Sequence, residues 1–190
     1  MKRWRLAVML ASLPLAASAA EVGGIKVDER ANVAGSELQL NGAGLRKMFL
    51  VKVYVAGLYL TEKRTSPADI LALAGPKRVS VILMRNVSAR QLVDALDKGI
   101  RENSSPTEQL QLKADIEQLA ANLLSFRRGK KGDLITFDWL PDAGTLVLVN
   151  GEAKGKAIPQ DALYHVFLRV WVGDKPTNAG LKKALLGRAS

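Results

Sequence analysis

Three side chains that could hold an anion lie close together in the chain: Arg46, Lys52 and Tyr54. They belong to residues 41–60, a mostly apolar stretch that is typical of a long β-strand. Alternate residues of a strand point to opposite faces, so the even numbering of these three predicts one shared face. We therefore expect a ligand contact there. A purely structural reading stays open, with Lys52 at a sheet edge and Tyr54 in the core with a hydrated hydroxyl.

Other chemistries find little support in the sequence. The chain has no cysteine, and its one histidine, His165, stands in an apolar helical pattern. A typical zinc site or a Ser-His-Asp constellation is therefore not legible, and His165 is interpreted as structural. The Gly-x-Gly at 42–44 precedes a strand instead of following one, so it predicts no nucleotide site. Asp133 and Asp138 are interpreted as turn and edge residues. No cofactor and no metal are expected.

The first 20 residues have the order of a secretory signal peptide. Lys2, Arg3 and Arg5 precede an apolar run, 6–15, which is followed by small residues up to Ala20. Cleavage after Ala19 or Ala20 and export to a bacterial periplasm are expected, with an uncleaved anchor as the alternative. The remaining part, 21–190, is long enough for one domain with a sizeable core.

The charge balance indicates which partners suit the mature chain. The formal net charge is +10, and losing the three leader cations leaves +7. Such a surface attracts anions. Nucleic acid is not expected in a periplasm, whereas anionic lipid headgroups, fatty carboxylates and acidic partners are present, so a peripheral membrane contact is compatible with this charge. A basic surface that only maintains solubility is an equal alternative.

The pattern of elements predicts an α+β fold. Short strands are expected over 23–40, ending at an Asn41-Gly42 hairpin turn, with a further strand over 78–84. Ser88 and Ser105 begin two helices, the second with a capping box and running to about residue 124. Strands over 134–139 and 145–149 and helices over 161–173 and 181–186 complete the chain. Strands and helices that do not alternate strictly favour an antiparallel sheet with helices on one face.

Two motifs resemble those of the chalcone isomerase superfamily, and of its bacterial, exported chalcone isomerase-like proteins in particular. They are Lys52-Val-Tyr-Val-Ala-Gly-Leu-Tyr-Leu60 with Arg46 upstream, and Leu168-Arg-Val-Trp-Val-Gly-Asp-Lys-Pro176 continuing through 181–187. The resemblance implies an open-faced β-sandwich-like fold, in which a large antiparallel sheet is covered by a helical layer. It also implies a ligand cleft between the two layers.

The resemblance assigns roles to individual positions. Arg46 matches the arginine of the plant enzymes, and Tyr54 stands at their strand threonine. In the noncatalytic fatty-acid-binding branch, an arginine and a tyrosine hold the carboxylate. The helix tyrosine and asparagine of the enzymes are replaced by Leu92 and Gly99, which leaves catalysis uncertain. On one straight strand, Arg46 and Tyr54 would lie about 26 Å apart, so a bend or bulge near 44–47 is expected.

Three functions are consistent with these residues. The first is noncatalytic periplasmic binding of a fatty acid or similar amphipathic or aromatic anion, with Arg46, Lys52 and Tyr54 at the headgroup. The second is an isomerase or intramolecular lyase acting on an unsaturated or phenolic molecule, with Arg46 and Tyr54 as its catalytic groups. The third is an envelope protein that binds a partner through its basic surface. The first is preferred.

Overall fold

The structure is a computed structural model that describes residues 19–188. The predicted leader lies outside this part, apart from Ala19 and Ala20, which begin the first strand. The strands are β1 (Ala19–Val22), β2 (Ile25–Asp28), β3 (Arg30–Val33), β4 (Ser36–Met48), β5 (Val51–Leu60), β6 (Lys77–Leu83), β7 (Val87–Ser88), β8 (Arg128–Gly129), β9 (Leu134–Leu140), β10 (Gly144–Val149) and β11 (Glu152–Ala153). The helices are α1 (Pro67–Ala72), α2 (Ala89–Glu102), α3 (Pro106–Gln111), α4 (Lys113–Leu124), α5 (Asp161–Val172) and α6 (Ala179–Leu185).

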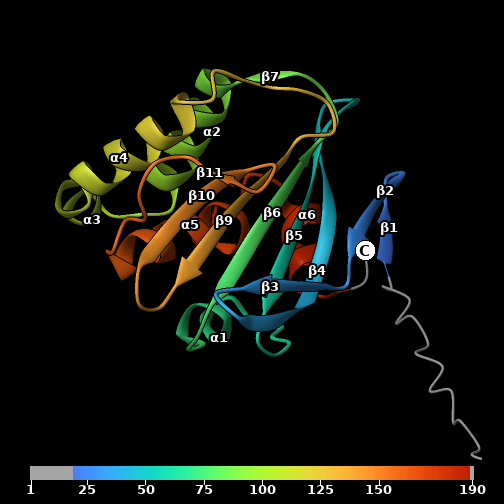
Figure 1. Cartoon of the computed structure of the whole chain (residues 1–190), viewed down its shortest axis with the longest axis horizontal. Coiled ribbons are helices and arrows are strands. Elements are labelled where there is room, and N and C mark those ends of the chain that lie inside the picture. Colours follow the sequence, from blue (N-terminus) through green and yellow to red (C-terminus); the bar gives the residue numbers. More distant parts are fainter. Residues whose placement is uncertain (1–18, 189–190) are drawn as a thin grey trace, which may run out of the picture.

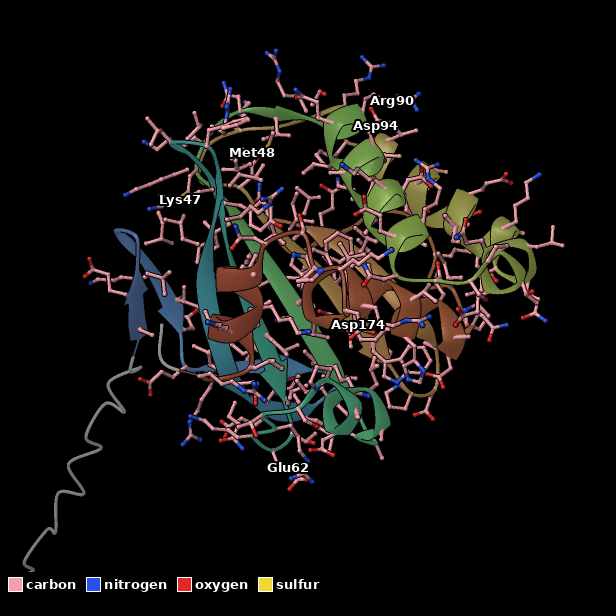
Figure 2. The ribbon with its side chains drawn as sticks, turned by 180° about the vertical axis from the view of Figure 1, so that it is seen from behind. Lys47, Met48, Glu62, Arg90, Asp94 and Asp174 are labelled. Atoms are coloured by element: carbon pink, nitrogen blue, oxygen red, sulfur yellow. The ribbon has the colours of Figure 1, made fainter. Side chains whose placement is uncertain are left out.

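Seven strands form one antiparallel sheet in the order β11-β10-β9-β6-β5-β4-β3. In Figure 1 the sheet faces the viewer and α5 and α6 lie behind it, whereas Figure 2 brings these helices to the front. The arrangement confirms the predicted α+β fold, an antiparallel sheet covered by a helical layer. Among the described residues, no helix is both long and apolar enough to cross a membrane.

The alternation of β5 gives the sheet two buried faces. Ala56, Leu58 and Leu60 belong to the large core that the sheet shares with the helices. Val55 and Tyr59 point to the other face, where they form a smaller core with residues of β2, β3 and β4. Successive strand residues point to opposite sides, so the continuous apolar run of β5 reflects burial on both faces.

Two predicted boundaries are wrong. The strand β4 continues through Asn41 and Gly42, where a register shift takes the place of the expected turn, and the chain reverses at Phe49 and Leu50 instead. A carbonyl of α6 would lie 2.0 Å from a Cβ at Gly42, so this glycine serves close packing. The helix expected from 105 to 124 divides at Leu112 into α3 and α4.

The prediction that Asp138 is an edge residue is also wrong. It lies in β9, inside the sheet and not at its edge, and is only 3% exposed. The guanidinium of Arg78 on β6 donates to both carboxylate oxygens, with Nε–Oδ1 and Nη2–Oδ2 distances of 2.6 Å. The buried carboxylate is therefore one half of a bidentate ion pair that links two central strands.

Candidate functional site

The β4–β5 hairpin brings Arg46 and Tyr54 together. The two residues are direct cross-strand partners. Opposite residues of an antiparallel pair have Cβ atoms roughly 5 Å apart, so the large separation expected on a single straight strand does not arise. The sequence predicted a bend or bulge near 44–47, and a register shift does fall between Arg46 and Lys47. The chain also reverses completely at the turn after Met48. A guanidinium and a phenol thus stand side by side on one sheet face.

Lys52 lies on the opposite face, so its predicted grouping with Arg46 and Tyr54 is wrong. Arg46 pairs with Tyr54 and Lys47 pairs with Lys52, which leaves Val53 as an extra residue in β5. One extra residue inverts the alternation beyond it. The Lys52 ammonium instead donates to the carbonyl of Gly23 at 3.2 Å, joining β5 to the β1–β2 hairpin.

The hydroxyl of Tyr54 is held by the helical layer. Trp171 on α5 donates its indole N–H to this oxygen, with an Nε1–Oη distance of 3.0 Å. Burial raises the pKa of Tyr54 above 10.0, although the hydrogen bond from Trp171 and the charge of Arg46 oppose the rise. The phenol is therefore protonated at neutral pH. Within residues 19–188, its proton meets no acceptor, so it can donate to a ligand.

Trp171 is fixed by an aromatic cluster between α5 and the sheet. Its ring lies 4.8 Å from that of Phe167 and 6.3 Å from that of Phe137, measured between centroids. Phe167 is one turn earlier on α5, so both rings face the core together. Trp171 was not among the site residues predicted from the sequence. Its place in an apolar helical pattern was the available signal, because a buried indole N–H requires an acceptor.

A small apolar cavity adjoins the Tyr54 side chain. Its volume is about 60 Å³. It lies between β5, β6 and β9 on one side and α2, α4 and α5 on the other, with Thr177 as the second hydroxyl in its wall. Its main apolar lining residues are Val81, Leu92, Leu96, Ile135, Phe137 and Val170. The predicted cleft between sheet and helices thus exists as a nearly filled space.

The helix α2 closes this cavity. Ser88 caps it with a reciprocal bond to Gln91, and Leu92 and Leu96 reach the cavity from its inner face. Gly99 packs against α5, where an added Cβ would lie 2.6 Å from Cγ1 of Val170. The position that the resemblance gives to a catalytic asparagine therefore has no room for a side chain in this structure. Leu92, at the catalytic tyrosine position, contributes only apolar surface.

Other parts of the described chain fit an amphipathic ligand less well. A larger surface hollow of about 580 Å³ lies at β1, β3, β4 and the turn that follows β5, and its wall carries Glu29, Arg30, Glu37 and Lys63. Its charges suit water more than an acyl chain. No group of three potential metal ligands occurs within residues 19–188. His165 is only partly buried and lies 3.6 Å from Asp161 on its own helix, away from the cavity.

Comparisons with known proteins agree with this architecture. A crystal structure of a fatty-acid-binding protein from Arabidopsis thaliana superposes with a TM-score of 0.66 at 14% sequence identity. The alignment covers 86% of this chain and 92% of the plant protein. No curated protein matches the sequence significantly. The family model described as chalcone isomerase-like matches residues 19–187, nearly the whole described chain. This protein therefore belongs to the chalcone isomerase-like family.

Proposed function

We propose that this protein is a noncatalytic binder of a fatty acid or a similar amphipathic anion. The acyl or aromatic part enters the space between sheet and α2, and the anionic headgroup is held by Arg46 and Tyr54. The observation that carries the proposal is the cross-strand Arg46–Tyr54 pair beside an apolar cavity, with the tyrosine proton uncommitted. The shared fold with a plant fatty-acid-binding protein supports it.

The two polar groups suit a carboxylate in complementary ways. Arg46 supplies a fixed positive charge, and a charge-assisted hydrogen bond to a carboxylate is roughly twice as strong as a neutral one. Tyr54 adds a directed O–H donor, oriented by Trp171 at 3.0 Å. A fatty alcohol or a methyl ester lacks the negative charge, so it is expected to bind more weakly than the acid.

The cavity must widen to admit such a ligand. Its volume is about 60 Å³, whereas ligand pockets commonly enclose roughly 300–1,000 Å³. Three lining residues, Leu92, Ala95 and Leu96, come from α2. An outward shift of α2 therefore enlarges the cavity without breaking the ladder of the central strands. Ligand binding is expected to coincide with movement of this helix.

Noncatalytic binding is preferred to isomerase chemistry for a structural reason. Two polar contacts that the resemblance assigns to catalysis are replaced by Leu92 and Gly99. Losing one hydrogen bond to a developing charge typically costs about 3 kcal/mol of transition-state stabilisation. The close contact of Gly99 with α5 also leaves no space for an equivalent group.

Binding of palmitate labelled with ¹³C at the carboxyl carbon tests the proposal. The wild type is expected to give a bound carboxylate resonance and a measurable dissociation constant by calorimetry. Arg46→Gln and Tyr54→Phe are each expected to weaken binding roughly tenfold to a hundredfold, because each removes a hydrogen bond to a charged group. Lys52→Gln is the matched control, since Lys52 lies on the other face, and it is expected to change affinity less than twofold, or about 0.4 kcal/mol.

A second variant tests whether the acyl chain of the ligand occupies the cavity. Leu92→Trp fills the cavity from α2 and is expected to abolish binding while the circular dichroism spectrum stays native. Unchanged palmitate affinity in both Leu92→Trp and Arg46→Gln would contradict the proposed site.

We also propose that the protein is exported. The leader at residues 1–20 suggests that the mature protein acts in a bacterial periplasm. Intact mass measurement of protein recovered from a periplasmic extract is expected to show a chain that begins at Ala20 or Glu21. A full-length mass in the membrane fraction would favour an uncleaved anchor.

A further inference from the structure

The β4–β5 hairpin ends in an apolar tip that faces solvent. Phe49 and Leu50 are 97% and 98% exposed, and the flanking Met48 and Val51 are about half exposed. Four consecutive apolar side chains at a protruding turn are unusual, because solvent-facing turns are normally polar. In Figure 1 this tip extends from the upper edge of the sheet, clear of the helical layer. Residues 48–51 form the hairpin tip.

The backbone of the hairpin tip is also unfavourable for its sequence. Phe49 has a φ of +53°, in the left-handed region that glycine and asparagine normally occupy in two-residue turns. A bulky aromatic residue at such a position is an outlier, and strained positions of this kind concentrate at functional sites. Folding alone would favour glycine here, so the aromatic side chain requires another explanation.

Basic side chains surround the hairpin tip. The backbone N–H of Met84 donates to the carbonyl of Val53, and the backbone N–H of Lys131 donates to the side-chain oxygen of Asn86, so the 84–86 and 130–133 turns lie at the same end. Figure 2 shows Lys47 and Met48 at this end, with Arg90 and Asp94 of α2 along the same rim and Glu62 at the opposite end. The exposed cations of the three turns are Lys47, Lys52, Arg85, Lys130 and Lys131.

The acidic groups at this end do not cancel that charge. Asp133 is engaged within its own turn, where it accepts from the Lys130 backbone N–H at 2.7 Å and from Asn150 at 3.1 Å. Asp94 stands on α2, whose first turns also carry Arg90. The region around the hairpin tip is therefore net positive.

We propose that the hairpin tip docks onto the surface of an anionic phospholipid bilayer. Phe49 and Leu50 enter the interface between headgroups and acyl chains, and the surrounding lysines and Arg85 contact lipid phosphates. A convex tip with two almost fully exposed apolar side chains offers little area to a protein partner but is readily accommodated by a fluid bilayer. Basic residues near an anionic membrane surface add to the attraction. This inference does not depend on the proposed ligand, although Arg46 and Tyr54 lie on the same hairpin.

Vesicle co-sedimentation tests the docking surface. The mature wild-type chain is expected to sediment with vesicles of equal parts phosphatidylcholine and phosphatidylglycerol, and to stay in solution with phosphatidylcholine alone. Phe49→Gly is expected to reduce the partition coefficient by roughly tenfold to a hundredfold, the value for losing one large apolar side chain. Because glycine suits the φ of this position, the variant should fold at least as well as the wild type.

One control and two further variants distinguish docking through the hairpin tip from nonspecific adsorption to vesicles. Leu110 is 75% exposed and belongs to α3, which lies at the far side of the molecule from the hairpin tip in Figure 1, so Leu110→Ser is expected to leave vesicle binding unchanged. Lys47→Gln combined with Lys52→Gln is expected to weaken binding to anionic vesicles by roughly an order of magnitude. A Phe49→Trp reporter should shift its emission to the blue on binding and be quenched by brominated lipid.

Several results would overturn the inference. Equal sedimentation of wild type and Phe49→Gly would remove the hairpin tip from the interaction. So would an unquenched Phe49→Trp reporter. A concentration-dependent dimer that disappears in Phe49→Gly, with no vesicle binding by the wild type, would assign the hairpin tip to self-association.

Discussion

Replacing Gly99 with alanine is expected to destabilise the protein, although alanine is the better helix former. Gly99 is buried in α2, where this helix packs on α5. An ideal Cβ at this position would lie 2.6 Å from Cγ1 and 3.1 Å from Cγ2 of Val170. Val170 is itself 3% exposed and cannot turn into solvent. Either its side chain or α2 must therefore shift.

Two opposing contributions determine the size of the effect. Overpacking a core typically costs about 1–3 kcal/mol. Alanine recovers about 0.5–1 kcal/mol in a helix because it has less backbone freedom to lose. The midpoints of these two ranges leave a net loss of about 1.2 kcal/mol in the free energy of unfolding, which corresponds to a fall of roughly 2–5 °C in Tm for a domain of this size.

Urea unfolding measured by circular dichroism provides the assay. Gly180→Ala is the matched control, because Gly180 is an exposed glycine of α6 with only the Asn178 side chain nearby, at 3.3 Å. It should gain stability or stay neutral. In Gly99→Ala/Val170→Ala, the clashing methyl groups are absent, so the double variant should lose about 1 kcal/mol less than the sum of the single changes. A Gly99→Ala protein as stable as Gly180→Ala would refute the packing argument.

The remaining predictions concern buried polar groups. Asp138→Asn removes the negative partner of the bidentate Arg78 pair and is expected to cost about 3–5 kcal/mol of unfolding free energy. The control Glu37→Gln, at the exposed Arg30 pair, should cost less than about 1 kcal/mol. Equal losses of unfolding free energy in the two variants, measured by urea unfolding, would contradict this expectation. Burial raises the pKa of all three tyrosines, Tyr54, Tyr59 and Tyr164, above 10.0. The absorbance of the folded protein at 295 nm should therefore rise at a higher pH than that of the urea-unfolded protein. Because the folded state retains these protons longer, the tyrosines contribute stability that is complete below pH 10 and declines above it. Tyrosine ionisation at the same pH in the folded and the unfolded protein would contradict the described burial.

Local signals in the sequence determined most of the elements. The capping residues Ser88 and Ser105 begin helices as predicted, because the side-chain oxygen of each accepts from a backbone N–H group in the first turn of its own helix. The order of strands and helices predicted the α+β class, since each apolar face must be covered by a later element.

The composition of the candidate site depended on the tertiary structure. A turn at Phe49 rather than Asn41 decided that Arg46 faces Tyr54, and one extra residue at Val53 moved Lys52 to the other face. Neither feature has a local signal, because a bulky residue in a left-handed turn and a strand bulge are favoured only by the partners around them.

Residues close together in the chain were enough to predict the helix starts at Ser88 and Ser105, the α+β class and two members of the candidate site, Arg46 and Tyr54. Which side chains meet was visible only once the elements were packed: Trp171 donates to Tyr54 across 117 positions of the chain, and Gly99 of α2 packs against Val170 of α5. Such contacts depend on how separate elements pack, and packing is set by the shape of the whole core rather than by any local pattern.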